Sequence, residues 1–162
     1  PGLRRRLAAF VYEGVLLFGV LMIAGLLYGL VTQQRHALVG QHGLQLFLFL
    51  VLGLYFTWFW SHGGQTVAMK TWHVRLLGRD GQPVGTARAW VRYLLSWLWF
   101  LPALLGVWLA ELRSGGAITM ALLAGVVVYA LLSRLNRRRQ FVHDLISRTE
   151  LVYWPTAKRK RR

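Results

Sequence analysis

The sequence has no cysteine and few charged residues. Of its 162 residues 15% are charged and 5 are acidic, whereas about a quarter of the residues of an average soluble domain are charged. The absence of cysteine excludes disulfides, thiolate metal ligands and thiol nucleophiles. With 56% hydrophobic residues and a mean hydropathy of +0.42, the composition favours a membrane protein.

The charges that are present are mostly positive. The chain has 20 lysines and arginines, which give a formal net charge of +15, a balance also found in nucleic-acid-binding domains. Long uncharged apolar runs do not fit a basic soluble domain, and no aromatic residues interleave with the terminal basic run. We therefore expect the lipid bilayer, and not nucleic acid, to be the partner.

A helix needs about 20 mostly apolar residues to cross a bilayer. Four stretches approach this length, so we predict an all-α membrane protein with four transmembrane helices near Leu7–Val31, Leu44–Trp60, Tyr93–Ala110 and Ala117–Leu132. The first stretch is too long for the apolar region of a cleaved signal peptide. Pro102 lies inside the third stretch and should kink it, because proline lacks an amide N–H.

The distribution of lysine and arginine predicts the orientation. Of the 20 basic residues, 18 precede the first span, lie between the second and third, or follow the fourth; the other two are Arg35 and Arg113. Loops rich in lysine and arginine stay in the cytoplasm. We therefore expect a multi-pass protein of the bacterial inner membrane, with both termini cytoplasmic.

The loop between the second and third spans has a pattern of its own. Polar and apolar residues alternate over Thr71–Leu77, which predicts a strand, and the turn signal Gly78–Gln82 follows it. A short cytoplasmic β-hairpin is therefore predicted here. We expect Thr86 to cap the helix that leads into the third span.

The segment before this strand is a candidate loop site. Its members are Gly64, Gln65, Thr66 and Lys70, and the glycine-rich backbone is suited to exposing amides to an anion or substrate. The alternative is a flexible exit from the second helix, which physical considerations slightly favour.

The C-terminal part falls into two pieces. Phe141, Leu145 and Arg148 share one helical face, so Arg137–Tyr153 is predicted to be an amphipathic segment at the membrane surface. The basic tail Lys158–Arg162 is expected to bind anionic lipid headgroups, each charge contributing about 1 kcal/mol near an anionic leaflet.

Small residues recur at helix-packing spacing in two spans. Gly25 and Gly29 form one such pair, and Ala117, Ala121 and Gly125 form a stripe in the last span. Small residues let helices approach closely in membranes. The contact lies either within one chain or between copies in an oligomer.

Glu13 is the only acid placed well inside a span. An ionised carboxylate near the middle of a membrane helix costs about 2.5–3.5 kcal/mol on insertion scales, so it needs a partner or a wet cavity. The Arg6 side chain is too distant to form a salt bridge with Glu13 unless it bends inward. Arg5 or Arg92 is then the expected basic partner of Glu13. Glu13 is then either a proton- or cation-binding group or half of a structural ion pair.

Four motifs in order resemble the RDD family of small membrane proteins, over Arg4 to Val152. They are the opening segment Arg5–Glu13, the stretch Gly64-Gln65-Thr66 with Lys70, the Asp80-Gly81 turn with Arg88–Arg92, and Arg138–Leu145 followed by Thr149. The resemblance implies one transmembrane domain over residues 1–154, with a basic tail at 155–162.

The arginine and two aspartates that name the family fall on the Arg5-Arg6 pair, on Glu13 and on Asp144. Glu13 departs from the usual aspartate, and Ala68 stands where the family usually has glycine. The resemblance implies transport, including cation/proton exchange, although other proteins with this domain resemble scaffold or accessory subunits.

Two functions are therefore predicted. The first is an oligomeric transporter that binds a proton or monovalent cation at Glu13 and Asp144. The alternative is a non-enzymatic scaffold or accessory subunit that holds a partner protein or anionic lipid on its basic face. An enzyme is not expected, because His62, His73 and His143 have no nucleophile at recognisable spacing, and neither a cofactor nor a metal is predicted.

Overall fold

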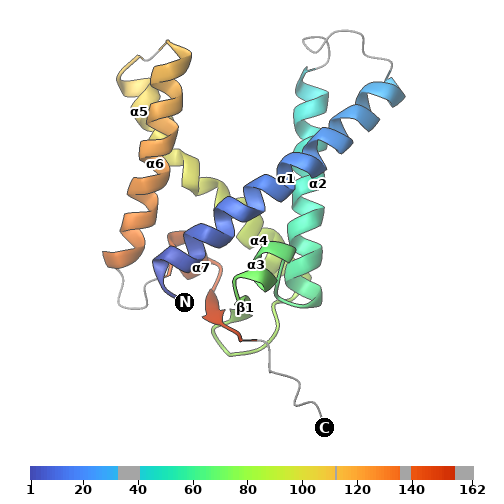
Figure 1. Ribbon diagram of the computed structural model, residues 1–162, viewed down its shortest axis with the longest axis vertical. Coiled ribbons are helices and arrows are strands. Elements are labelled where there is room, and N and C mark those ends of the chain that lie inside the picture. The colour runs from blue at the N-terminus through green and yellow to red at the C-terminus, as the bar shows by residue number, and fades with distance from the viewer. Residues whose placement is uncertain (33–40, 112, 136–139, 156–162) are drawn as a thin grey trace. The chain divides into compact units, whose positions relative to one another are not determined.

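The computed structural model describes residues 1–32, 41–111, 113–135 and 140–155 (Figure 1). Its helices and strands are α1 (Leu3–Thr32), α2 (Gln41–His62), α3 (Val67–Thr71), β1 (Val74–Gly78), α4 (Thr86–Ser96), the 3-10 helix η1 (Trp97–Phe100), α5 (Leu101–Leu109), α6 (Gly115–Leu135), α7 (Val142–Ile146) and β2 (Thr149–Tyr153). They form two compact units, one of residues 1–76 with 152–162 and one of residues 77–151. The basic tail predicted to bind headgroups lies outside the described residues.

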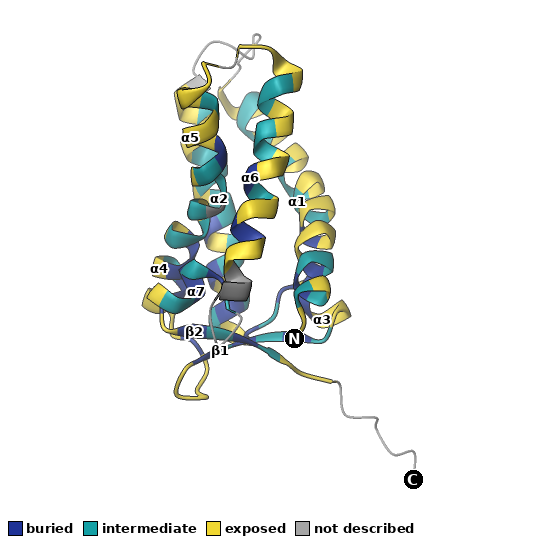
Figure 2. Ribbon diagram, turned by 90° about the vertical axis from the view of Figure 1, so that its left-hand side faces the viewer, coloured by how far each residue is buried: buried dark blue, intermediate teal, exposed yellow. Residues whose placement is uncertain are grey.

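Four helical stretches are long and apolar enough to span a membrane, as predicted. They are Leu3–Thr32, His42–His62, Thr86–Leu109 and Gly115–Leu132. Most of the large apolar side chains of α1 are exposed (Figure 2). An exposed apolar surface of this kind suits contact with lipid.

In the first unit α1 packs against α2. The rings of Tyr28 and Phe47 have centroids 5.2 Å apart across this contact. A Cβ added to Gly43 would lie 2.5 Å from the Tyr28 hydroxyl, so the Tyr28 ring lies directly over this glycine. An added Cβ at Gly25 or Gly29 would meet nothing within 4 Å, so this predicted pair makes no close contact within the described chain.

In the second unit α5 packs against α6. A Cβ added to Gly125 would lie 2.5 Å from the Cβ of Ala103, which shows that small residues bring these helices together. The contact predicted for the last span therefore lies within one chain at Gly125.

The third span is segmented. It consists of α4, η1 and α5, and Pro102 lies in the first turn of α5. The interruption falls just before Pro102, where the missing amide removes a helical hydrogen bond. The helix begins at Thr86 with Gly85 as its N-cap, so Thr86 is not the capping residue that the sequence predicted.

A two-stranded antiparallel sheet is present, but the predicted local hairpin is wrong. β1 pairs with β2, which lies about 75 residues further along the chain. In the first unit the amide of Trp154 donates to the carbonyl of His73 at 2.8 Å. In the second unit the amide of Arg79 donates to the carbonyl of Arg148 at 3.1 Å. The turn after β1 does form, with Gly81 at φ 74, and it leads towards α4.

The described part of the predicted amphipathic segment, residues 140–153, is not one continuous helix. Its helix α7 has five residues, and β2 follows after Arg148, which has a φ of 53. Phe141 and Asp144 are buried. Residues 149–153 alternate between buried and more exposed positions, a period of two that indicates a strand.

The two halves of the chain repeat one order of elements. In each half, spanning helices are followed by a five-residue helix, a residue with positive φ and a five-residue strand. The offset between α3 and α7 is 75 residues, and it is the same between β1 and β2, and between the positive-φ residues His73 and Arg148. The halves are therefore structural repeats.

Candidate functional site

Glu13 is buried in α1, with 7% of its surface exposed. The hydroxyl of Tyr55 on α2 donates to its Oε1 at 2.7 Å, and the hydroxyl of Thr66 donates to its Oε2. Both donors are neutral. One carboxylate therefore joins three segments of the first unit: α1, α2 and the start of α3.

Thr66 has a second role in the same place. It is the N-cap of α3, and its hydroxyl oxygen accepts a hydrogen bond from the amide of Met69 at 3.2 Å. The side chain is fully buried. Because the hydroxyl has one hydrogen, which it gives to Glu13, this arrangement suits an ionised carboxylate that accepts from both sides.

The other residues of the candidate loop site hold the backbone together. The carbonyl of Gly64 accepts from the amide of Leu76 at 2.7 Å, and Gln65 donates to the carbonyl of Val74 at 2.7 Å. Gly64 has a φ of 70, and an added Cβ would lie 2.5 Å from the Leu76 carbonyl oxygen, so only glycine fits. Lys70 is exposed in α3.

Each of the two arginines suggested as partners of Glu13 lies against another group within its own unit. The Arg5 guanidinium lies 4.3 Å from the centroid of the Tyr153 ring. Arg92 forms its ion pair with Asp144. Arg6 is 5% exposed and lies in the first turns of α1.

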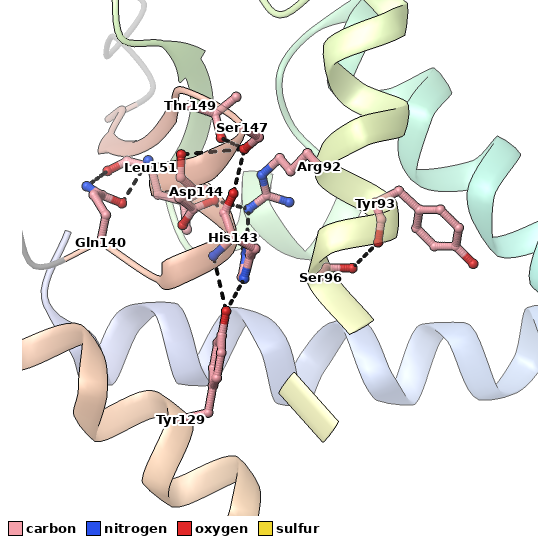
Figure 3. A network of polar contacts seen from close by, with 10 residues as sticks. All are labelled: Arg92, Tyr93, Ser96, Tyr129, Gln140, His143, Asp144, Ser147, Thr149 and Leu151. Carbon is pink, nitrogen blue, oxygen red and sulfur yellow. Dashed lines mark hydrogen bonds and ion pairs between the residues drawn. The ribbon is translucent and has the colours of Figure 1, made fainter. Parts of the chain in front are cut away.

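A second polar cluster lies in the second unit, built from α4, α6 and α7 (Figure 3). The Nη2 atom of Arg92 donates to Oδ1 of Asp144 at 2.7 Å, and both side chains are buried. At the C-terminal end of α7 the hydroxyls of Ser147 and Thr149 lie 2.9 Å apart. The ion pair between Arg92 and Asp144 therefore fixes α7 to α4.

His143 links this ion pair to α6. Its backbone amide donates to the Tyr129 hydroxyl oxygen at 3.1 Å, and its Nδ1 lies 3.0 Å from the same hydroxyl. Tyr129 can then donate its own hydrogen to Nδ1, which places the proton of a neutral imidazole on Nε2. That atom lies 3.4 Å from Oδ1 of Asp144 and 3.4 Å from Nη2 of Arg92.

The two clusters correspond to each other in the repeat. Each combines a charged residue from the first spanning segment of its half, Glu13 or Arg92, with the short helix of that half. Each also contains a tyrosine from the second spanning helix, Tyr55 or Tyr129. They differ in charge, because Asp144 is bonded by a guanidinium, whereas the described hydrogen bonds to Glu13 come from hydroxyls.

Sequence reasoning missed three members of these clusters. Tyr55 and Tyr129 lie in apolar spans, where a tyrosine is usually read as a lipid-facing ring. His143 lies in the polar segment after the last span, which gives no sign that its ring is buried, whereas it is 3% exposed. A usable signal was the spacing of 74 residues between the tyrosines, close to the offset of the repeat.

The fold and these clusters define a multi-pass helical membrane protein with buried polar groups inside its spanning segments. The RDD family model matches residues 1–148, and the chain belongs to this family. No curated protein and no solved structure matches the chain.

Proposed function

We propose that this RDD-family protein is an oligomeric transporter that exchanges a proton for a monovalent cation at Glu13. The observation that carries the proposal is the buried carboxylate of α1 held by two neutral hydroxyls. Ionisable groups inside spanning segments commonly mark ion or proton pathways. Carboxylate and hydroxyl oxygens are also the ligands that hard cations prefer.

The hydrogen bonds allow two states of Glu13. In the ionised state the hydroxyls of Tyr55 and Thr66 donate to it, and a cation can balance its charge. In the protonated state Glu13 donates one hydrogen bond itself, and one hydroxyl hydrogen turns away. Release of the proton and binding of the cation therefore leave the charge of the site unchanged.

Comparison with the second cluster supports this choice of residue. The Asp144 carboxylate is already balanced by Arg92, a cation fixed in the chain. Exchange at Asp144 would require that ion pair to break, whereas the hydroxyls at Glu13 need only rotate. We therefore assign the exchangeable site to Glu13 and a structural role to Asp144.

The proposal includes a location and an orientation. The excess of basic residues before the first span, between the second and third, and after the fourth supports a bacterial inner-membrane protein with both termini in the cytoplasm. Four spans are few for a complete pathway, so we propose that copies share one. The open space beside Gly25 and Gly29 on α1 is compatible with contact between copies.

Flux through sealed liposomes tests the proposal. Purified protein is reconstituted with a pH-sensitive dye inside, and Na⁺ or K⁺ is added outside. We expect cation-dependent proton flux in the wild type and in Glu13→Asp, and none in Glu13→Gln. Glu111→Gln, the same change at an exposed acid, is the matched control and should keep the flux. Wild-type flux in a folded Glu13→Gln protein would overturn the assignment.

A second candidate is a non-enzymatic scaffold. It is favoured by the fact that the hydrogen bonds of Glu13 join α1 to α2 and α3, a structural task that requires no ion exchange. In that case Glu13→Gln would lower the free energy of unfolding and the yield, and the wild type would carry no flux under any cation gradient.

A further inference from the structure

We propose that a surface of the first unit binds the phosphate-bearing headgroups of anionic phospholipids. The surface consists of Arg5, Arg75, Tyr153 and Trp154, and we call it the arginine–aromatic face. Its arginines come from α1 and β1, and its rings come from β2 and the residue that follows it. The inference is independent of ion transport.

Each arginine of this face lies against a ring. The Arg5 guanidinium is 4.3 Å from the centroid of Tyr153, and the Arg75 guanidinium is 4.5 Å from the centroid of Trp154. The rings remain accessible, because Tyr153 is 50% exposed and Trp154 is 46% exposed. Stacking holds each planar guanidinium in place, which reduces the entropy lost when it binds a phosphate.

The positive charge of this face is not neutralised by the protein. Within the described residues neither Arg5 nor Arg75 forms an ion pair with a carboxylate. Glu13 is the only acid in residues 1–76, it is buried, and there is none in residues 152–162. An external anion is therefore the natural counterion.

The position of Arg5 indicates which anion. It lies two residues before Leu7, where the apolar stretch of α1 begins, so it is about 3 Å from the edge of the apolar stretch. Tyr153 is stacked on Arg5 and shares that level. Tyrosine and tryptophan favour the headgroup region. Arginine at this depth meets lipid phosphates, with which it forms strong charge-assisted hydrogen bonds.

The test compares spin-labelled phosphatidylglycerol with spin-labelled phosphatidylcholine in membranes containing the full chain. The measured quantity is the ratio of the two association constants. We expect Arg5→Gln/Arg75→Gln to lower this ratio by about fivefold or more. About fivefold is the factor by which one arginine near an anionic surface raises an association constant. The matched control, Arg113→Gln/Arg148→Gln, removes the same charge at exposed positions elsewhere and should leave the ratio close to wild type.

Several results would overturn the proposal. An unchanged ratio in the double variant would do so, and so would an equal fall in the control, because net charge alone would then explain it. If the wild type bound inorganic phosphate but showed no preference for phosphatidylglycerol over phosphatidylcholine, the ligand would be a soluble phosphate and not a lipid. The basic tail stays unchanged in every variant.

A second measurement does not depend on the arginine variants folding. Brominated phosphatidylglycerol should quench tryptophan fluorescence more strongly than brominated phosphatidylcholine, and Trp154→Phe should remove that difference. Trp108→Phe, at an exposed residue of α5, is the control and should preserve it. The same difference in wild type and Trp154→Phe would place the preferred lipid elsewhere and contradict the proposal.

Discussion

Asp144→Asn should strongly destabilise the protein. The substitution removes a charge but little volume, and it leaves the Arg92 guanidinium buried without the carboxylate that lies 2.7 Å away. Breaking a buried ion pair by removing one partner typically costs about 3–5 kcal/mol. We expect a loss of that size in the free energy of unfolding, measured by SDS titration in mixed micelles.

An exposed ion pair of the same unit provides the control. Arg88 and Asp80 are 3.7 Å apart, and their side chains are 41% and 56% exposed. Exposed pairs contribute about 0–1 kcal/mol, so Asp80→Asn should change the free energy of unfolding by no more than that. Equal losses for Asp80→Asn and Asp144→Asn would refute the reasoning, because burial would then make no difference.

A double variant separates the lost interaction from the stranded charge. Replacing both partners of a buried pair by apolar residues of similar volume is often neutral or stabilising. Arg92→Met/Asp144→Leu should therefore recover most of the stability that Asp144→Asn loses. A double variant less stable than Asp144→Asn would show that the pair stabilises the fold beyond compensating its own burial.

Two further predictions concern packing and orientation. Gly125→Val should lower the free energy of unfolding by about 1–3 kcal/mol, because its Cβ would overlap Ala103. The control Gly106→Val, at an open position of α5, should leave it within about 0.5 kcal/mol. Equal effects would contradict the contact between α5 and α6. A reporter active only in the periplasm, fused after Trp154, should be inactive, and strong activity there would rule out a cytoplasmic C-terminus.

The spanning helices could be predicted because their signal is local. Twenty consecutive apolar residues indicate a span without any knowledge of the neighbouring chain, and the break before Pro102 follows from the covalent structure of proline. The strand at Val74–Gly78 was also visible in its alternating pattern. These features depend on a few adjacent residues.

The remaining features depend on partners far apart in the sequence. β1 pairs with a strand about 75 residues away, and the local turn signal after it favoured a hairpin instead. The repeat was hidden because few equivalent residues are identical, among them Gln65 with Gln140 and Leu76 with Leu151. Charge considerations suggested an arginine for Glu13, but the packing of α2 and α3 supplies hydroxyls.

Proton release on cation binding tests the assignment of Glu13 most directly. Purified protein is placed in a weakly buffered detergent solution with a pH indicator, which reports the protons released. Na⁺ or K⁺ is then added at constant ionic strength. If Glu13 exchanges a proton for a cation, the wild type and Glu111→Gln should release protons in proportion to the cation bound, and Glu13→Gln should release none. Release from Glu13→Gln at the wild-type level would contradict the account.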